Sequence, residues 1–335
     1  MPWANDAGIG WKGLLPFEPN LGQEQVVSAL IETAQLTKCF EDLTAVDSLT
    51  LKVEEAQVLA LLGPNGAGKT TTVRMLSSIL KPTAGYAHVA GYDVVKDARQ
   101  VRHVVGHLTE LPGLYLRMRA LDYLDFFGEL QGMAPCVRQE RAEELLKHFG
   151  IWEARGRRLG EYSKGMRQKV ALVRAMLHDP QVLFLDEPTS AMDPLSAKQV
   201  RDAIANLRGT HHTVILCTHN LFEAETLADR IAVIRRGQMI AQGTPDQLKR
   251  DLLGPSVWEV RLAHPLTQPW PSLNGQAHVE CTDSLSMRYR TPDPEMANPR
   301  LLRQVQGIGG EVVALSELPR SLEDVYLKLV QDPVQ

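Results

Sequence analysis

The most informative residues of this chain form a glycine-rich turn, residues 63–70, which reads GPNGAGKT. Its spacing is G-x-x-x-x-G-K-[ST]: the glycines let backbone N–H groups converge on phosphate oxygens, the lysine adds positive charge, and the hydroxyl can ligate Mg²⁺. We therefore expect a site for the phosphates of a nucleoside triphosphate. The residues assigned to it are Gly63, Pro64, Asn65, Gly66, Ala67, Gly68, Lys69, Thr70 and Thr71.

Two apolar segments flank this turn and would position it. The run 58–62, VLALL, is long enough for a strand buried on both faces and too short for a helix. Residues 71–80 carry Val73, Leu76 and Leu80 at helical spacing, which predicts a helix with its positive dipole end at the phosphates. The alternative is an ordinary glycine-rich turn between a strand and a helix.

Two adjacent carboxylates, Asp186 and Glu187, follow the apolar run 182–185. Sheets of α/β proteins bind ligands at the carboxyl ends of strands, and the strand period of two sends neighbouring side chains to different sides. One carboxylate can hold Mg²⁺ while the other takes a proton from water attacking a γ-phosphate. His219 follows another buried run, 213–217, and can donate a hydrogen bond to developing negative charge. A solvated acidic loop and a structural histidine are the alternatives.

A second anion site is expected where Ser163 and Gly165 precede a helix. The apolar stripe of that helix is Val170, Val173 and Leu177, so the Ser163 hydroxyl and the first backbone amides face out from a helix N-terminus. Taken alone, a turn of this kind is more often a simple helix N-cap, by about three to one.

The composition argues against several other classes of protein. The 36 basic and 40 acidic residues contain no block of like charge, so no nucleic-acid partner is expected. The four cysteines are far apart, which argues against zinc binding and against a disulfide framework and fits a reducing cytoplasm. No apolar run approaches the ~20 residues of a membrane-spanning helix, so any membrane role requires a partner.

The sequence pattern divides the chain into three parts. Residues 1–27 are rich in Gly, Pro and Asn and are expected to form an N-terminal extension. Residues 28–253 are expected to form the nucleotide-binding unit, an α/β core that carries a helical subdomain at about 115–165. Residues 254–335 are expected to form a small C-terminal α/β appendage.

Within these parts, strands are expected at 28–53, at 87–95 and in the apolar run 101–109. The last helix is expected to begin at Ser321, because Asp324 stands three residues further on and completes a capping box.

Taken in order, these motifs resemble those of the ATP-binding cassette ATPases over about residues 31–248. GPNGAGKTT resembles the phosphate loop of that family, YSKGM its signature motif, LFLDEPTS its strand with two acids, SAMDP its following loop, and THN its switch histidine. The resemblance implies a P-loop NTPase core: a mostly parallel sheet with helices on both faces, an antiparallel β subdomain and a helical subdomain bearing the signature.

The resemblance also implies individual roles. Phe40 is expected to stack on adenine, while Ser163, Lys164, Gly165 and Asp193 are expected to contact the nucleotide. Glu187 and His219 are the expected catalytic residues, and the expected Mg²⁺ ligands are Thr70, Asp186 and Glu110. Glu110 departs from the family, which has glutamine there; an ionised glutamate only accepts hydrogen bonds and adds negative charge.

Two features, YSKGMRQK and the ending SLEDVYL, resemble the antibiotic and daunorubicin-type export ATPases. This implies an ATPase with ATP and Mg²⁺ as cofactors. The resemblance places it peripherally on the cytoplasmic face of the membrane, where it would power a permease formed by a separate chain. It also implies a homodimer of ATPase subunits, or a heterodimer, with each ATP held between two copies. The alternatives are a soluble cassette ATPase of translation or DNA repair, and a regulatory subunit that hydrolyses ATP weakly.

Overall fold

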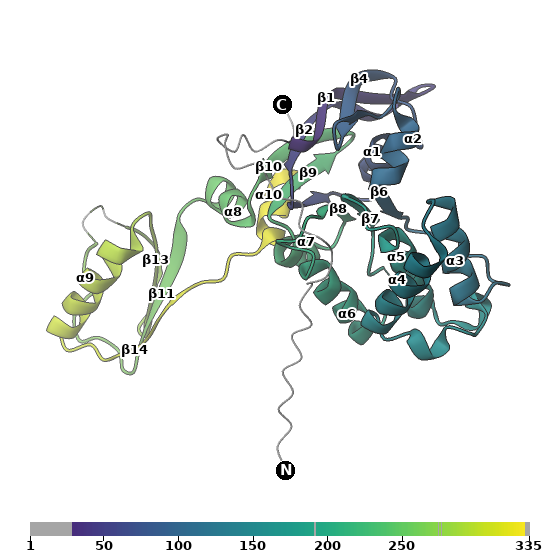
Figure 1. Ribbon diagram of the computed structural model, residues 1–335. Helices are drawn as coiled ribbons and strands as arrows, with labels where there is room; N and C mark the ends of the chain where they lie inside the picture. Colours follow the sequence, from purple (N-terminus) through teal and green to yellow (C-terminus); the bar gives the residue numbers. More distant parts are fainter. Residues whose placement is uncertain (1–28, 191, 274, 276, 332–335) are drawn as a thin grey trace, which may run out of the picture.

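The computed structural model describes residues 29–190, 192–273, 275 and 277–331, so the expected extension, 1–27, lies outside the described residues. Figure 1 shows a nucleotide-binding unit of two sheets with surrounding helices, and a smaller sheet that stands apart from it.

The central sheet of the large unit is mostly parallel. Its strands are β3 (Val58–Leu62), β6 (Val105–Leu108), β7 (Val182–Asp186), β8 (Thr213–Thr218), β9 (Arg230–Arg235) and β10 (Gln238–Gly243). The spatial order is β10-β9-β3-β8-β7-β6, with only β10 antiparallel to its neighbour. Because β3, β7 and β8 are buried along their whole length, their apolar runs correctly predicted two-sided burial.

Alternate residues of β3 enter two different hydrophobic cores. Val58, Ala60 and Leu62 belong to one core, whereas Leu59 and Leu61 belong to the other. The first core is covered by α5, α6 and α7, and the second by α1 and α2 together with the antiparallel sheet. The bounds are α1 (Lys69–Leu76), α2 (Ala98–Val104), α5 (Lys164–Met176), α6 (Pro194–Ala205) and α7 (Leu221–Leu227).

The antiparallel sheet confirms the strands expected before the phosphate turn. Its order is β2-β1-β4-β5, made from β1 (Ala29–Phe40), β2 (Leu43–Glu54), β4 (Ala84–Val89) and β5 (Tyr92–Asp93). The expected helical block is formed by α3 (Ala120–Leu130), α4 (Pro135–His148) and the 3-10 turns η1 (Trp152–Ala154) and η2 (Leu159–Glu161). It packs on α5 through α3 and α4.

Two local expectations were wrong. The helix expected over 71–80 runs from Lys69 to Leu76, because the Ser77 hydroxyl bonds the Val73 carbonyl at 2.8 Å and Ser78 takes φ +56°. The run 101–109 is not one strand: α2 occupies its start and β6 its end. Val101 is the only fully buried residue of α2, and Val104 packs partly buried against the same core.

The smaller sheet has the order β12-β13-β11-β14 and carries α9 on one face (Figure 1). Its elements are β11 (Ser256–Leu262), β12 (His278–Thr282), β13 (Ser286–Thr291), α9 (Pro294–Gly307) and β14 (Val312–Glu317). It follows α8 (Pro245–Leu253), which begins at a capping box formed by Thr244 and Gln247.

The last helix, α10 (Leu322–Gln331), does not pack on this small sheet. Leu322 and Val325 are buried in the core of the nucleotide-binding unit, where α10 contacts α7 and α8. The expected capping box is present, since the Asp324 carboxylate accepts from the Ser321 amide at 3.1 Å and the Ser321 hydroxyl accepts from the Asp324 amide at 3.1 Å. We therefore propose that the accessory unit comprises 254–320, shorter than the expected 254–335.

Candidate functional site

The glycine turn lies between β3 and α1, and its shape depends on two missing side chains. A Cβ on Gly63 would come within 2.2 Å of the Ile234 carbonyl oxygen, and one on Gly68 within 2.4 Å of the Ala45 oxygen. Gly68 also has φ +105°, which residues other than glycine rarely adopt. The turn is therefore wedged between the central sheet and the β1–β2 hairpin.

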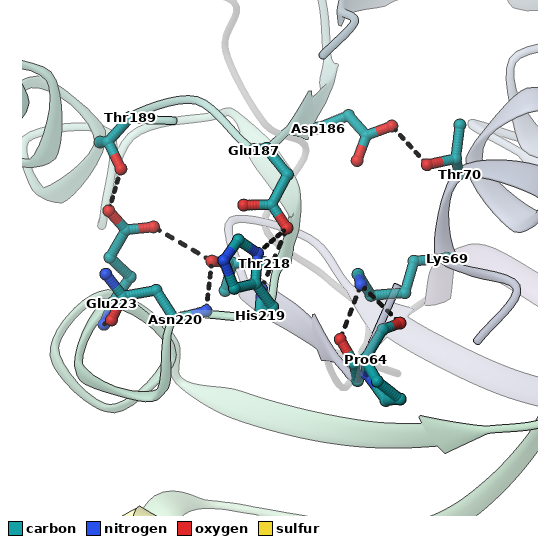
Figure 2. A network of polar contacts seen from close by, with 11 residues as sticks. Pro64, Lys69, Thr70, Asp186, Glu187, Thr189, Thr218, His219, Asn220 and Glu223 are labelled. Carbon is teal, nitrogen blue, oxygen red and sulfur yellow. Dashed lines mark hydrogen bonds and ion pairs between the residues drawn. The ribbon is translucent and has the colours of Figure 1, made fainter. Parts of the chain in front are cut away.

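Lys69 is buried at the base of the turn, with 6% of the residue exposed. Its ammonium group donates to the carbonyl oxygens of Gly63 at 2.7 Å and Pro64 at 3.2 Å (Figure 2). Pro64, Asn65 and Gly66 are exposed at the rim. The charge that a phosphate requires is therefore held inside the loop that would surround it.

Thr70 and Asp186 meet across the gap between the turn and β7. The Thr70 hydroxyl donates to an Asp186 carboxylate oxygen at 2.7 Å (Figure 2). Burial raises the pKa of Asp186, and the negative charges of Glu187 and Glu110 raise it further, against the opposing effects of Thr70 and Lys69. Glu110, in the segment after β6, is thus near enough to act on Asp186, and a positive ion beside Asp186 would relieve this repulsion.

Glu187 turns to a different partner, as expected for neighbouring residues at a strand end. Its carboxylate accepts from the His219 backbone amide at 3.0 Å and contacts the His219 ring Nδ1 at 2.7 Å. Glu187 has φ +49°, and its own amide bonds the Cys217 carbonyl at 2.9 Å. The structure therefore brings the two expected catalytic residues, Glu187 and His219, from the ends of adjacent strands into direct contact (Figure 2).

Sequence reasoning missed one buried carboxylate beside this pair, Glu223. It is 1% exposed and accepts hydrogen bonds from the hydroxyls of Thr189 and Thr218. It thereby ties together the loops that carry Glu187 and His219. The sequence signal for Glu223 was Asn220, a typical N-cap residue that here caps α7. Glu223 therefore falls in the first turn of this helix, where a negative charge is stabilised.

The signature segment forms a separate cluster with the loop before α6. Ser163 caps α5 by accepting from the Met166 amide at 3.2 Å, and Lys164 beside it is exposed. A Cβ on Gly165 would lie 3.8 Å from a carboxylate oxygen of Asp193, which itself caps α6. Among the described residues, no hydrogen bond or ion pair joins this cluster to the turn at 63–71.

Phe40 ends β1 on the hairpin that covers the turn. Its ring is 44% exposed, and the Lys38 ammonium lies 4.9 Å from the ring centroid. The same hairpin contributes Ala45, whose carbonyl lies against Gly68. The Phe40 ring is thus exposed on this hairpin, and its stacking on adenine stays a prediction.

A groove between β6 and the helical block contains an unusual histidine. His107 lies there with Phe127, Arg174 and His178. The His107 Nε2 is buried without a hydrogen-bond partner, and burial, with the charges of Arg174 and Arg74, lowers the pKa of His107 to about 4. The imidazole is therefore neutral at physiological pH.

A mostly parallel sheet with a lysine-containing glycine turn at one strand end and two acids at another defines a nucleoside-triphosphate hydrolase with the P-loop fold. Residues 46–190 match the family model described as ABC transporter. The chain belongs to the ATP-binding subunits of ABC transporters, which bind and hydrolyse ATP and work with separate membrane permease subunits.

Individual relatives support this assignment. The daunorubicin/doxorubicin resistance ATP-binding protein of Streptomyces peucetius is 38% identical over 308 residues, covering 90% of this chain and 93% of that protein. The doxorubicin resistance ATP-binding protein of Mycobacterium tuberculosis is 40% identical over 302 residues, covering 88% and 90%. A solved ATP-binding subunit of an ABC transporter matches with a TM-score of 0.63 and 27% identity, covering 67% of this chain and 94% of that one.

Because these relatives are transporter subunits, the alternative of a cassette ATPase of translation or DNA repair is not favoured. In the part of the chain that the structure describes, no helix has the length and apolar character needed to cross a membrane.

Proposed function

We propose that this chain powers an exporter and that its ATP sites are completed only between two copies. The observation that carries the proposal is the separation of the two anion-binding elements. Lys69 and Thr70 lie at one end of the central sheet, whereas the exposed Ser163 N-cap belongs to a cluster with no described contact to them. A second copy related by two-fold symmetry would supply the missing cluster to each turn.

The proposed roles follow from the contacts of each residue. When ATP binds, the Lys69 ammonium group gives up its hydrogen bonds to the loop carbonyls of Gly63 and Pro64 and donates to phosphate oxygens instead. Glu187 accepts a proton from the attacking water, and the His219 backbone amide, which donates to it at 3.0 Å, holds that carboxylate in position. The His219 ring donates a hydrogen bond to the γ-phosphate as negative charge develops on it, and so does the Ser163 hydroxyl of the other copy.

The donor set also fits Mg²⁺. The Thr70 hydroxyl and the Asp186 carboxylate, 2.7 Å apart, are hard oxygen ligands of the kind that Mg²⁺ prefers, and we propose that Glu110 contributes through a water molecule. Bound Mg²⁺ would neutralise charge on the β- and γ-phosphates. Glu110 would retain more negative charge there than the family's glutamine does.

The proposed cargo and location rest on the relatives. Two of them are named for resistance to daunorubicin or doxorubicin, and we propose export of a drug-like molecule by a permease on a separate chain. The ATPase would then sit on the cytoplasmic face of the membrane, where ATP is available. Co-purification of the full chain with a membrane permease tests this pairing, and recovery of the chain from membranes without any permease would contradict it.

Mixing two inactive variants tests the composite site. Lys69→Ala removes the phosphate-binding charge, and Ser163→Arg blocks the opposite cluster at an exposed position. A mixed dimer of these variants contains one intact site, so random mixing should restore about a quarter of the wild-type turnover.

The matched control is a mixture of Lys69→Ala with Asp186→Asn. Both changes lie on the same side of the proposed site, so no mixed dimer has an intact one and no activity should return. Equal recovery in both mixtures, or none in either while mixed dimers are detected, would refute the composite site.

A single-variant experiment tests the base. Glu187→Gln should bind ATP with unchanged affinity, turn over ATP about 10²- to 10⁴-fold more slowly, and remain dimeric in ATP. Wild-type turnover by the purified variant would remove Glu187 from this role.

A further inference from the structure

A cluster of three metal-ligating side chains lies at the opposite edge of the central sheet from the nucleotide turn. Asp179 is in the loop that enters β7, and His211 and His212 are in the loop that enters β8. The catalytic acids lie at the other ends of these strands, after Leu185. The cluster is therefore distinct from the ATP site.

The distances in the cluster suit a tetrahedral ion. The His211 Nε2 lies 3.3 Å from one Asp179 carboxylate oxygen, and the His212 Nε2 lies 3.6 Å from the other. All three ligand atoms lie within 4.8 Å of one another. Ligands bound to Zn²⁺ at about 2.0–2.1 Å in tetrahedral geometry are about 3.3–3.4 Å apart. The Asp179–His211 pair already has this spacing, and the His212 Nε2 would have to move closer to the carboxylate oxygen that faces His211.

His212 is already oriented as a metal-bound histidine would be. His212 is 2% exposed, and its ring Nδ1 lies 2.7 Å from the Pro180 carbonyl oxygen. A carbonyl can only accept, so Nδ1 carries the proton and the neutral Nε2 presents a lone pair to the cluster.

One cation already competes for this carboxylate. The Arg141 guanidinium, on α4, lies 3.2 Å from an Asp179 oxygen and also pairs with Glu144. Metal binding would therefore use mainly the oxygen that faces His211, and would weaken a contact between the helical block and the loop before β7. Without a metal, the Arg141 guanidinium pairs with Asp179.

We propose that Asp179, His211 and His212 bind one Zn²⁺ ion, with water as the fourth ligand. Two imidazoles and one carboxylate are the donor types that Zn²⁺ takes in sites with an open position. His211, which is exposed, can rotate to complete the site.

The test is a titration of the purified full-length chain with Zn²⁺, without nucleotide, against a competing chromogenic chelator. The wild-type chain should bind one Zn²⁺ at this site and unfold at a higher temperature when it is bound. His211→Ala should weaken binding at least about tenfold and abolish the thermal shift. Because His211 is exposed, this variant is not expected to disturb folding.

Two control variants separate this site from other histidines. His278→Ala removes an exposed histidine of β12, and His219→Ala removes the one beside Glu187. Both should keep the Zn²⁺ affinity and thermal shift of the wild type. Unchanged binding by His211→Ala, or binding lost only in His219→Ala, would overturn the proposal. Co²⁺ in place of Zn²⁺ should give the intense visible absorption of four-coordination, and weak six-coordinate absorption would also contradict it.

Discussion

The clearest quantitative prediction concerns His107 and the stability of the nucleotide-binding unit in mild acid. The folded chain holds the pKa of His107 at about 4, against 6.5 for an unperturbed histidine. The physical cause is burial beside Arg174, with an Nε2 that has no partner to stabilise an added proton. Lowering the pH is therefore the perturbation.

The sign follows from proton binding. Between pH 6.5 and pH 4 the unfolded chain binds a proton at this histidine and the folded chain does not, so stability falls as the pH falls. Above pH 6.5 the effect of His107 is absent, because both states are neutral. From pH 7 to pH 5, the two pKa values predict that the free energy of unfolding falls by about 2 kcal/mol through this residue alone.

Urea unfolding at pH 7 and pH 5 measures this loss. Other groups titrate over the same range, so the quantity of interest is the difference between the wild type and His107→Phe. We expect the wild type to lose about 2 kcal/mol more than this variant. His103→Phe, at an exposed position of α2, is the matched control and should behave like the wild type. If wild type and His107→Phe lose the same stability, the reasoning is refuted.

Two further predictions concern Asp186 and α10. Because burial raises the pKa of Asp186, its ionised form opposes folding at neutral pH, an effect absent below the unperturbed value of 3.8. Asp186→Asn should therefore stabilise the nucleotide-free chain at pH 7 by about 0.5–2 kcal/mol while abolishing Mg²⁺-dependent turnover, and a lower unfolding midpoint would contradict this. Leu322→Ala should cost about 2–5 kcal/mol because Leu322 is 1% exposed, whereas Leu327→Ala on the same helix, 47% exposed, should cost less than about 1 kcal/mol. Equal effects in denaturant unfolding would show that α10 is not docked as described.

The central part of the site was predictable because local sequence determines it. Five apolar residues fix β3 as a buried strand, and the glycines that follow fix the turn, so Lys69 and Thr70 are placed by their neighbours. Asp186 comes from a distant segment. It still meets Thr70 because the carboxyl ends of parallel strands share one edge of the sheet.

The features that the sequence did not predict depend on contacts between distant residues or on patterns too short to interpret. Ser321 and Asp324 correctly predicted the start of α10, but a capping box carries no information about the surface on which a helix docks. Glu223 stands in no recognised motif and gains its position from Thr189, which lies 34 residues away. In 101–109, the run with apolar Val101, Val104, Val105 and Leu108 is too short for its spacing to distinguish a helix from a strand.

The docking of α10 has a consequence for the order of synthesis. Chains fold as they leave the ribosome, N-terminal parts first. Here the core of the ATPase lacks Leu322 and Val325 until residues 254–320 have already emerged and can fold as their own sheet. Until then α7 and α8 present an uncovered apolar surface to the cell, which is the kind of surface that chaperones bind.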